Sequence, residues 1–194
     1  MRQATIERTT KETDITCVLR LDGSGHARVE TGIGFLDHML ESFARHSRSD
    51  IELRCQGDLH VDQHHTVEDV GITLGQAVAQ CLGNGTGLER FGHTCCPLDE
   101  ALCAATVDIS GRPFLHYQLA FTRPHIGALD SSLLREFFGG FVLHAKWTLH
   151  LEVLRGENDH HIAEAAFKSF ARASRQAWGL SGFSDVPSTK GTLT

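Results

Sequence analysis

The chain has 194 residues, enough for one large domain or two small ones with a core that needs no disulfides. Hydrophobic residues make up 41% and charged residues 22%, as in soluble globular proteins, and no apolar run approaches the roughly 18 residues of a membrane span. The net charge of −6 gives no basic field for nucleic acid, so we expect no nucleic-acid partner. The lack of a long apolar run likewise leads us to expect no membrane partner. Histidine stands out, with 13 residues against 1 Tyr and 2 Trp, and favours metal or proton chemistry.

In chain order, the patterns predict alternating strands and helices. Strands are predicted at 18–21, 51–55, 101–109, 114–121 and 148–154, each an apolar or β-branched run that ends near turn residues. Helical spacing of apolar residues predicts helices at 35–46 and 133–145, and longer helices from about 64 to Gly83 and from about 160 to Gly179. The glycine-rich segment 83–87 is predicted to be a loop, and the tail after Gly179 to be irregular.

An internal repeat governs the predicted architecture. His64-His65-Thr66-Val67-Glu68 recurs as His160-His161-Ile162-Ala163-Glu164, and with a short gap 36–40 aligns with 134–138, which pairs His38 with Glu136. Two copies exclude a solenoid and favour two related halves around one core. We therefore expect a single domain, 1–194, of the α+β class. Its tandem half-domains would be approximately 1–86 and 87–194, with β-sheets on one side packed against a layer of helices on the other.

The repeated His-His-x-x-Glu motif predicts metal binding. On a helix, residues three or four apart share a face, so Glu68 can assist His64 or His65 in holding an ion. Neighbouring residues point about 100° apart, so the two histidines would serve different ions. Imidazole with carboxylate favours Mn, Fe, Ni or Zn over Ca or Mg. One such motif would suggest only a solvated helix start, but two copies in matching repeats favour a dinuclear site.

The cysteines point to no metal or disulfide framework. None of the six forms a C-x-x-C pair, which leaves a zinc ribbon unsupported. We expect them to be reduced and mostly buried, as in a cytosolic protein. No secretory signal is expected in the polar N-terminal segment, so the predicted location is the cytoplasm.

Six stretches resemble the imidazoleglycerol-phosphate dehydratase family, and they span nearly the whole chain in the family's order. They are 34–39, 60–69, 88–92, 110–113, 158–168 and 187–191. The resemblance implies a lyase that dehydrates D-erythro-imidazole glycerol phosphate to imidazole acetol phosphate in L-histidine biosynthesis. It also implies two Mn²⁺ ions per active site and a homo-oligomer of twenty-four subunits, with active sites between subunits.

The resemblance also assigns metal ligands residue by residue. One ion would take His38, His65, His160 and Glu164, and the other would take His64, Glu68, His161 and the residue at 136. That position is often histidine in the family and is Glu136 here. Glutamate is a competent Mn²⁺ ligand, so we expect the site to persist with an altered metal preference.

Further positions match family residues that contact substrate. Glu12 is the expected acid–base group. Together with the two expected ligand glutamates it makes up the candidate catalytic residues, Glu12, Glu68 and Glu164. Substrate-binding residues would be Glu12, Arg90, Arg112, Lys168, Ser188 and Lys190. Lys168 follows Glu164 by one helical turn and would share its face. Asp37 and Asp69 flank the ligands and are expected to orient imidazoles.

Two other functions would also explain part of the pattern. A metal store or sensor accounts for the histidine pairs but not for Lys168, Arg90 and Arg112. A dinuclear phosphohydrolase accounts for both the metals and the phosphate contacts, and release of free phosphate would distinguish it from a dehydratase.

Overall fold

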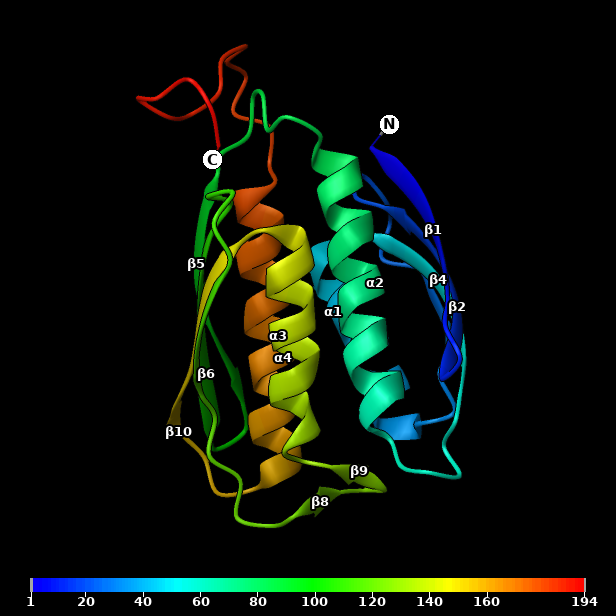
Figure 1. Cartoon of the computed structure of the whole chain (residues 1–194). Coiled ribbons are helices and arrows are strands. Elements are labelled where there is room, and N and C mark those ends of the chain that lie inside the picture. The colour runs from blue at the N-terminus through cyan, green and yellow to red at the C-terminus, as the bar shows by residue number, and fades with distance from the viewer. Residues whose placement is uncertain (1, 194) are drawn as a thin grey trace.

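The computed structural model describes residues 2–193, in which four helices lie between two four-stranded sheets (Figure 1). The first part contains β1 (Gln3–Thr9), β2 (Thr13–Arg20), β3 (Ala27–Glu30), α1 (Gly34–Ser47), β4 (Asp50–Gly57) and α2 (His64–Leu82). The second contains β5 (Phe91–Leu98), β6 (Ala101–Asp108), β7 (Phe114–Gln118), β8 (His125–Ile126), β9 (Leu129–Asp130), α3 (Leu133–Ala145), β10 (Thr148–Arg155) and α4 (Asp159–Ala177).

The two sheets have matching topologies. Their strand orders are β1-β2-β4-β3 and β5-β6-β10-β7, and in each the last pair is parallel while the other pairs are antiparallel. Only the second part carries an extra hairpin, β8–β9, among the described residues. The sheets thus pack against a layer of helices as predicted. The expectation of sheets on one side only was wrong, because each half contributes its own sheet and the two sheets cover both faces of the helix layer. The division into halves at 86 and 87 stays a prediction.

Alternating burial explains how each sheet meets the helices. In β2, Ile15, Cys17 and Leu19 are fully buried and the residues between them face outward. Between the sheets, aromatic side chains from different helices fill the core, such as Phe43 of α1 against Phe170 of α4. All described cysteines are free thiols, and Cys95 alone among them is exposed.

The helices pack in two pairs, α1 with α4 and α2 with α3. Gly71 and Gly75 allow the second pair to approach closely, because a Cβ atom there would lie 2.3 Å and 2.4 Å from the carbonyl oxygens of Phe137 and Phe141. These contacts advance in the same direction along both helices, so α2 and α3 run parallel. All four helices begin at the lower end of the molecule in Figure 1. The histidine motifs therefore lie at one end of the fold.

The predicted helices agree with the structure, whereas five of the described strands were not predicted and the strand predicted at 18–21 covers only the end of β2. The helix predicted at 133–145 coincides with α3, and the other helices differ by a residue or two at their ends. Strands β1, β3 and β5 were not predicted because they bury few apolar side chains, and β1 buries only Ala4. Strands β8 and β9 were not predicted because each has only 2 residues. Among the described helices, none is long and apolar enough to cross a membrane.

Candidate active site

Three predicted metal ligands converge where α1 packs against α4. Within residues 2–193, His38, His160 and Glu164 form the group of potential ligands whose donor atoms all lie within 4.8 Å of one another. Glu164 Oε2 lies 3.4 Å from His38 Nε2 and 3.2 Å from His160 Nε2. The i,i+4 spacing places His160 and Glu164 on one helix face, and helix packing brings His38 to them.

Lys168 keeps Glu164 in its anionic form. Its Nζ atom lies 2.7 Å from Glu164 Oε1, the oxygen that does not face the histidines. Burial acts to raise the pKa of Glu164, but the hydrogen bond and charge of Lys168, with a further hydrogen bond from His38, outweigh it and lower that pKa. The carboxylate is thus ionised at neutral pH, as a metal ligand must be.

A second, looser arrangement lies at the start of α2. His64 Nε2 is 3.5 Å from Glu68 Oε2, again at i,i+4 spacing. The neighbouring helix α3 carries the half-buried Glu136. One turn later, Gly140 packs closely against α2, because a Cβ atom there would lie 2.9 Å from the carbonyl oxygen of Glu68. In the described part of the chain, no ion pair joins Glu136 to His64. The two arrangements occupy equivalent helix pairs.

The second histidine of each motif lies outside these groups and contacts other carboxylates. His65 Nδ1 is 3.0 Å from Asp58, and its Nε2 is 3.6 Å from Glu12. His161 Nδ1 is 2.8 Å from Glu100. The hydrogen bond with Asp58 raises the pKa of His65, and the hydrogen bond with Glu100 raises the pKa of His161. The same bond lowers the pKa of Glu100 to about 2.

Asp37 and Asp69, which the sequence suggested for orienting imidazoles, contact other groups. Asp37 accepts hydrogen bonds from the backbone N–H and hydroxyl of Thr31. Asp69 pairs with Arg8 at 2.6 Å. No pattern in the sequence pointed to Asp58 or Glu100 as partners of these histidines. Glu100 lies in the turn between β5 and β6, and β5 was not predicted.

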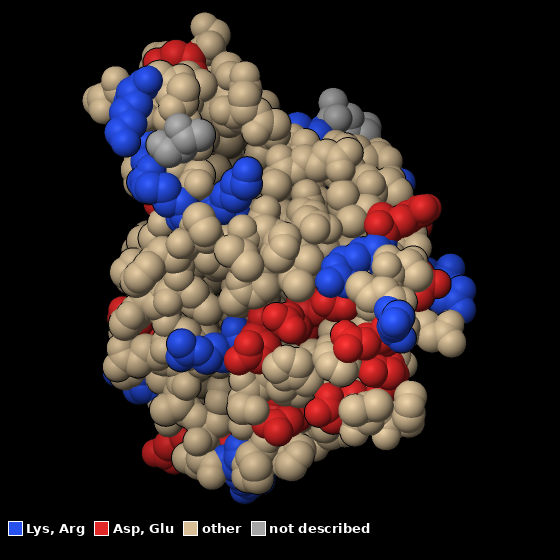
Figure 2. Space-filling view, in the orientation of Figure 1, with Lys and Arg blue, Asp and Glu red and all other residues tan. Residues whose placement is uncertain are grey.

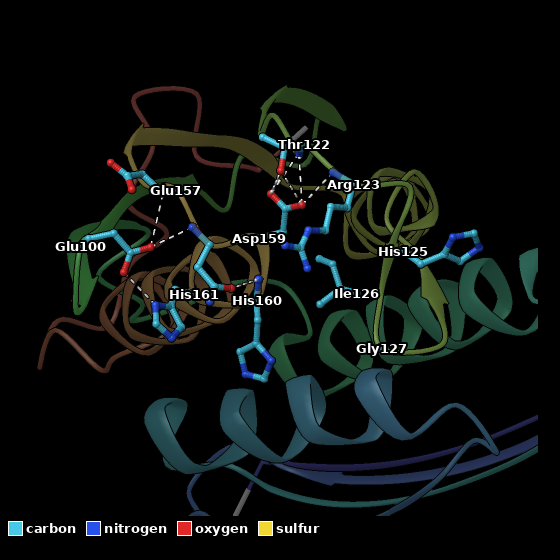
Figure 3. Close-up of a pocket in the computed structure, with 11 residues that line it drawn as sticks. Glu100, Thr122, Arg123, His125, Ile126, Gly127, Glu157, Asp159, His160 and His161 are labelled. Atoms are coloured by element: carbon cyan, nitrogen blue, oxygen red, sulfur yellow. Dashed lines mark hydrogen bonds and ion pairs between the residues drawn. The ribbon is translucent and has the colours of Figure 1, made fainter.

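A pocket of about 560 Å³ opens at the start of α4 (Figure 3). His160 and His161 line it from the helix, Glu100 from the β5–β6 turn and His125 from β8. Asp159 accepts hydrogen bonds from the backbone of Thr122 and Arg123 and so fixes one wall. Acidic side chains form a band across the lower half of the face in Figure 2, toward the end where the helices begin.

Four residues expected to bind phosphate lie near the other end of the fold. Arg90 binds Asp108 at 2.7 Å and the Pro187 carbonyl at 2.7 Å, which ties the tail to the start of β5. Its N–H donates to the Ala177 carbonyl at the end of α4. Arg112 donates to the Ser110 carbonyl, and the half-buried Ser188 accepts from the N–H of the exposed Lys190. At about 1.5 Å per residue, α4 separates this end from His160 by roughly 25 Å.

The family profile of imidazoleglycerol-phosphate dehydratase matches residues 31–174. The chain belongs to the imidazoleglycerol-phosphate dehydratase family. All eight residues expected to bind metal lie inside the match, whereas Glu12, Ser188 and Lys190 lie outside it.

Curated relatives named imidazoleglycerol-phosphate dehydratase cover the whole chain. The protein of Laribacter hongkongensis is 55% identical over 198 residues, and that of Aromatoleum aromaticum is 55% identical over 195 residues, each covering 100% of both chains. Two solved imidazoleglycerol-phosphate dehydratases share the fold. That of Staphylococcus aureus has a TM-score of 0.83 at 35% identity, covering 92% of this chain and 99% of its own. That of Pyrococcus furiosus, in complex with (S)-C348, has a TM-score of 0.84 at 38% identity, covering 97% and 100%.

Proposed function

We propose that this chain removes water from D-erythro-imidazole glycerol phosphate to give imidazole acetol phosphate, with two Mn²⁺ ions in each active site. Membership of the family makes it a hydro-lyase of histidine biosynthesis. The observation that carries the metal dependence is the convergence of His38, His160 and Glu164. We expect the enzyme to work in the cytoplasm.

The donor atoms suit the proposed ions. Two imidazoles and one ionised carboxylate offer hard and borderline ligands, which favour Mn²⁺, Fe²⁺ or Zn²⁺. We assign His38, His160, Glu164 and His65 to one ion. His64, Glu68, Glu136 and His161 are assigned to the other.

The spacing of these residues supports sites built between subunits. His65 is absent from the group formed by His38, His160 and Glu164 in the described chain, so a neighbouring subunit would supply it. Arg90 lies roughly 25 Å from His160 along α4, too far for one small substrate to reach both in one chain. We propose a homo-oligomer of twenty-four subunits, in which cations of one chain face metal ligands of another.

The reaction needs an electron sink and a proton carrier. The hydrogen that leaves lies on a carbon with no adjacent carbonyl, so the imidazole ring must accept the electron pair of the breaking C–H bond. The bound ions supply Lewis acidity that draws electron density from that ring. Glu12 is exposed and its carboxylate lies 3.6 Å from His65 Nε2, which supports a role in taking the carbon-bound proton or protonating the departing hydroxyl. Lys168, Arg90, Arg112, Ser188 and Lys190 would hold the phosphate.

A dehydration assay tests this function directly. Protein stripped with a chelator is titrated with Mn²⁺, and imidazole acetol phosphate and free phosphate are followed together. We expect acetol product that depends on Mn²⁺, with no free phosphate. Release of phosphate would favour a phosphohydrolase, and metal uptake without either product would favour a metal-storage or sensing role.

A further inference from the structure

The second histidine of each motif is held in the same way by a carboxylate on its Nδ1 atom. We propose that Asp58 and Glu100 are positioning residues, which accept a hydrogen bond from Nδ1–H of His65 and His161 and so leave each Nε2 free to bind metal. This inference rests on the metal sites of the proposed function, and it assigns a role to two residues outside the predicted ligand set.

Glu100 is held by backbone groups as well as by His161. One oxygen lies 2.8 Å from His161 Nδ1, while the other accepts the backbone N–H of Asn158 at 2.9 Å and of Glu157 at 3.3 Å (Figure 3). Asn158 in turn caps α4, because its side chain accepts the N–H of His160. The carboxylate thus links the β5–β6 turn to the helix that carries both histidines, and the position of the His161 ring depends on it.

Asp58 performs the same task from a different place in the fold. Its two oxygens lie 3.0 Å and 3.2 Å from His65 Nδ1, and its own N–H donates to the Glu12 carbonyl. Asp58 follows β4, whereas Glu100 lies in a hairpin turn, so the two are not equivalent positions of the repeat. The repeat places Glu12 at the position equivalent to Glu100, and Glu12 contacts the other ring nitrogen of His65, Nε2, at 3.6 Å. The contact of Asp58 with His65 Nδ1 is therefore not a copy of the Glu100 contact.

The positions of His65 and His161 explain why their rings would need to be oriented. His38 and His160 are already brought together with Glu164, but His65 and His161 stand apart from that group. A ligand that must meet an ion held largely by a neighbouring chain binds better if its ring is already oriented, because less side-chain freedom is lost. A carboxylate on the non-coordinating nitrogen also makes an imidazole a stronger ligand.

The test compares Mn²⁺ binding by wild-type protein, Glu100→Gln and Asp58→Asn. Free and bound Mn²⁺ are distinguished by electron paramagnetic resonance, and the melting temperature is measured on chelator-treated protein. Each variant should bind one of its Mn²⁺ ions about 10- to 100-fold more weakly, with the melting temperature of the metal-free protein unchanged. Glu157→Gln is the matched control: it removes the same charge from the same pocket, and its affinity should equal that of wild type.

Unchanged Mn²⁺ affinity in both variants would overturn the inference. An equal loss of affinity in Glu157→Gln would also overturn it, since that result would reflect net charge alone. A loss of affinity accompanied by a lower melting temperature of the metal-free protein would overturn it as well, since it would reflect a damaged fold. The conservative variant Asp58→Glu should restore part of the affinity lost in Asp58→Asn. Wild-type protein that binds Mn²⁺ without forming acetol product would overturn the proposed reaction and leave the inference standing.

Discussion

Glu164 divides its two oxygens between different partners. Oε2 faces His38 and His160, while Oε1 binds Lys168 at 2.7 Å. A carboxylate held by a lysine on one oxygen can present the other to a metal without turning away. The same ion pair places a substrate-binding candidate directly beside a proposed metal ligand, so the proposed function would couple metal binding and phosphate binding at this residue.

Replacing Glu164 with Gln should disable one metal site. The amide has nearly the same shape but carries no charge, so the ion loses its only anionic ligand from this group. We expect one Mn²⁺ fewer per chain and a fall of at least about 100-fold in kcat/KM, measured by metal analysis and steady-state kinetics. Activity near that of wild type with a full metal complement would contradict the ligand assignment.

Replacing Lys168 with Ala should act mainly on KM. Losing one charged hydrogen bond to phosphate costs about 1.5–3 kcal/mol, which corresponds to a KM roughly 10- to 100-fold higher. Steady-state kinetics on Mn²⁺-saturated protein measures the effect. Lys168→Arg should also raise KM, because a planar guanidinium does not replace a point charge held against Glu164. An unchanged KM would remove Lys168 from the substrate site.

At this scale, local spacing was enough to find the residues that share a helix face. The i,i+4 relation predicts the pairs His64–Glu68 and His160–Glu164, and both are present. It could not predict Asp58 or Glu100, because their contacts depend on where strand ends and turns lie relative to a helix start. Asp37 and Asp69 were expected to orient imidazoles because they are adjacent to the ligands in sequence. In the structure Asp37 accepts a hydrogen bond from Thr31, and Asp69 pairs with Arg8.

At the scale of elements, the α2–α3 contact depends on glycine. Gly71→Ala would place a Cβ atom 2.3 Å from the Phe137 carbonyl oxygen, so the helices would have to separate. We expect a loss of about 1–3 kcal/mol of stability or more, seen as a lower melting temperature.

Gly139→Ala is the matched control on α3, since nothing lies within 4 Å of its added Cβ atom. It should stabilise the protein by about 0.5–1 kcal/mol, because alanine loses less backbone entropy than glycine in a helix. Equal effects of the two substitutions would show that helix propensity, and not close approach, governs this contact.

The turn before β3 should show a pH-dependent stability. Burial acts to raise the pKa of Asp50, but the N–H groups of His26, Ser24 and Gly25, with the Ser24 hydroxyl, donate to its carboxylate and hold the pKa below its usual value. The stabilisation is therefore complete above the unfolded-state pKa of about 3.9 and is lost as the pH falls through the lower folded-state pKa.

Asp50→Asn should cost about 0.5–1 kcal/mol at pH 7, because the charged acceptor is lost but solvent screens this partly exposed carboxylate. Thermal unfolding at a series of pH values measures the difference from wild type, which should shrink below about pH 3.9. A difference that stays constant down to pH 3 would show that the charge of Asp50 contributes nothing.

Helices were easier to predict than strands. Each helix carries a continuous buried stripe, such as Leu36, Met39, Leu40 and Phe43 in α1, which periodicity detects. Strand β1 buries one side chain, and β3 is four residues long, so neither has enough alternation to be recognised. Their places in the sheet come from pairing with β2 and β4, which is information from distant parts of the chain.

At the scale of the whole molecule, the separation of the two functional ends makes assembly a requirement of the proposed chemistry. The proposed metal ligands lie toward the end where the helices begin, and Arg90 lies where α4 ends. The repeat and the layered fold could be anticipated from the sequence. The placement of His65 and His161 apart from the converged group could not, because periodicity says nothing about which helices become neighbours.

Activity should therefore follow oligomeric state. Light scattering coupled to gel filtration should show an assembly far larger than one chain for Mn²⁺-loaded protein. Extensive chelation should give smaller species, with activity and size recovering together when Mn²⁺ is restored. A fully active monomer would contradict the proposed sharing of ligands between subunits.

The helix layer has one further consequence, for the origin of the chain. In the repeat, α1 corresponds to α3 and α2 to α4, so the contact of α1 with α4 and the contact of α2 with α3 are the same contact seen twice. This is the geometry of a symmetric dimer, in which one surface pairs with its own copy. Two copies of an ancestral half-chain would have formed both contacts, and any substitution would have altered both at once. Fusion of the two genes would have freed each copy to change alone. His38 in one half and Glu136 at the equivalent position of the other are the kind of difference that only a fused chain can hold.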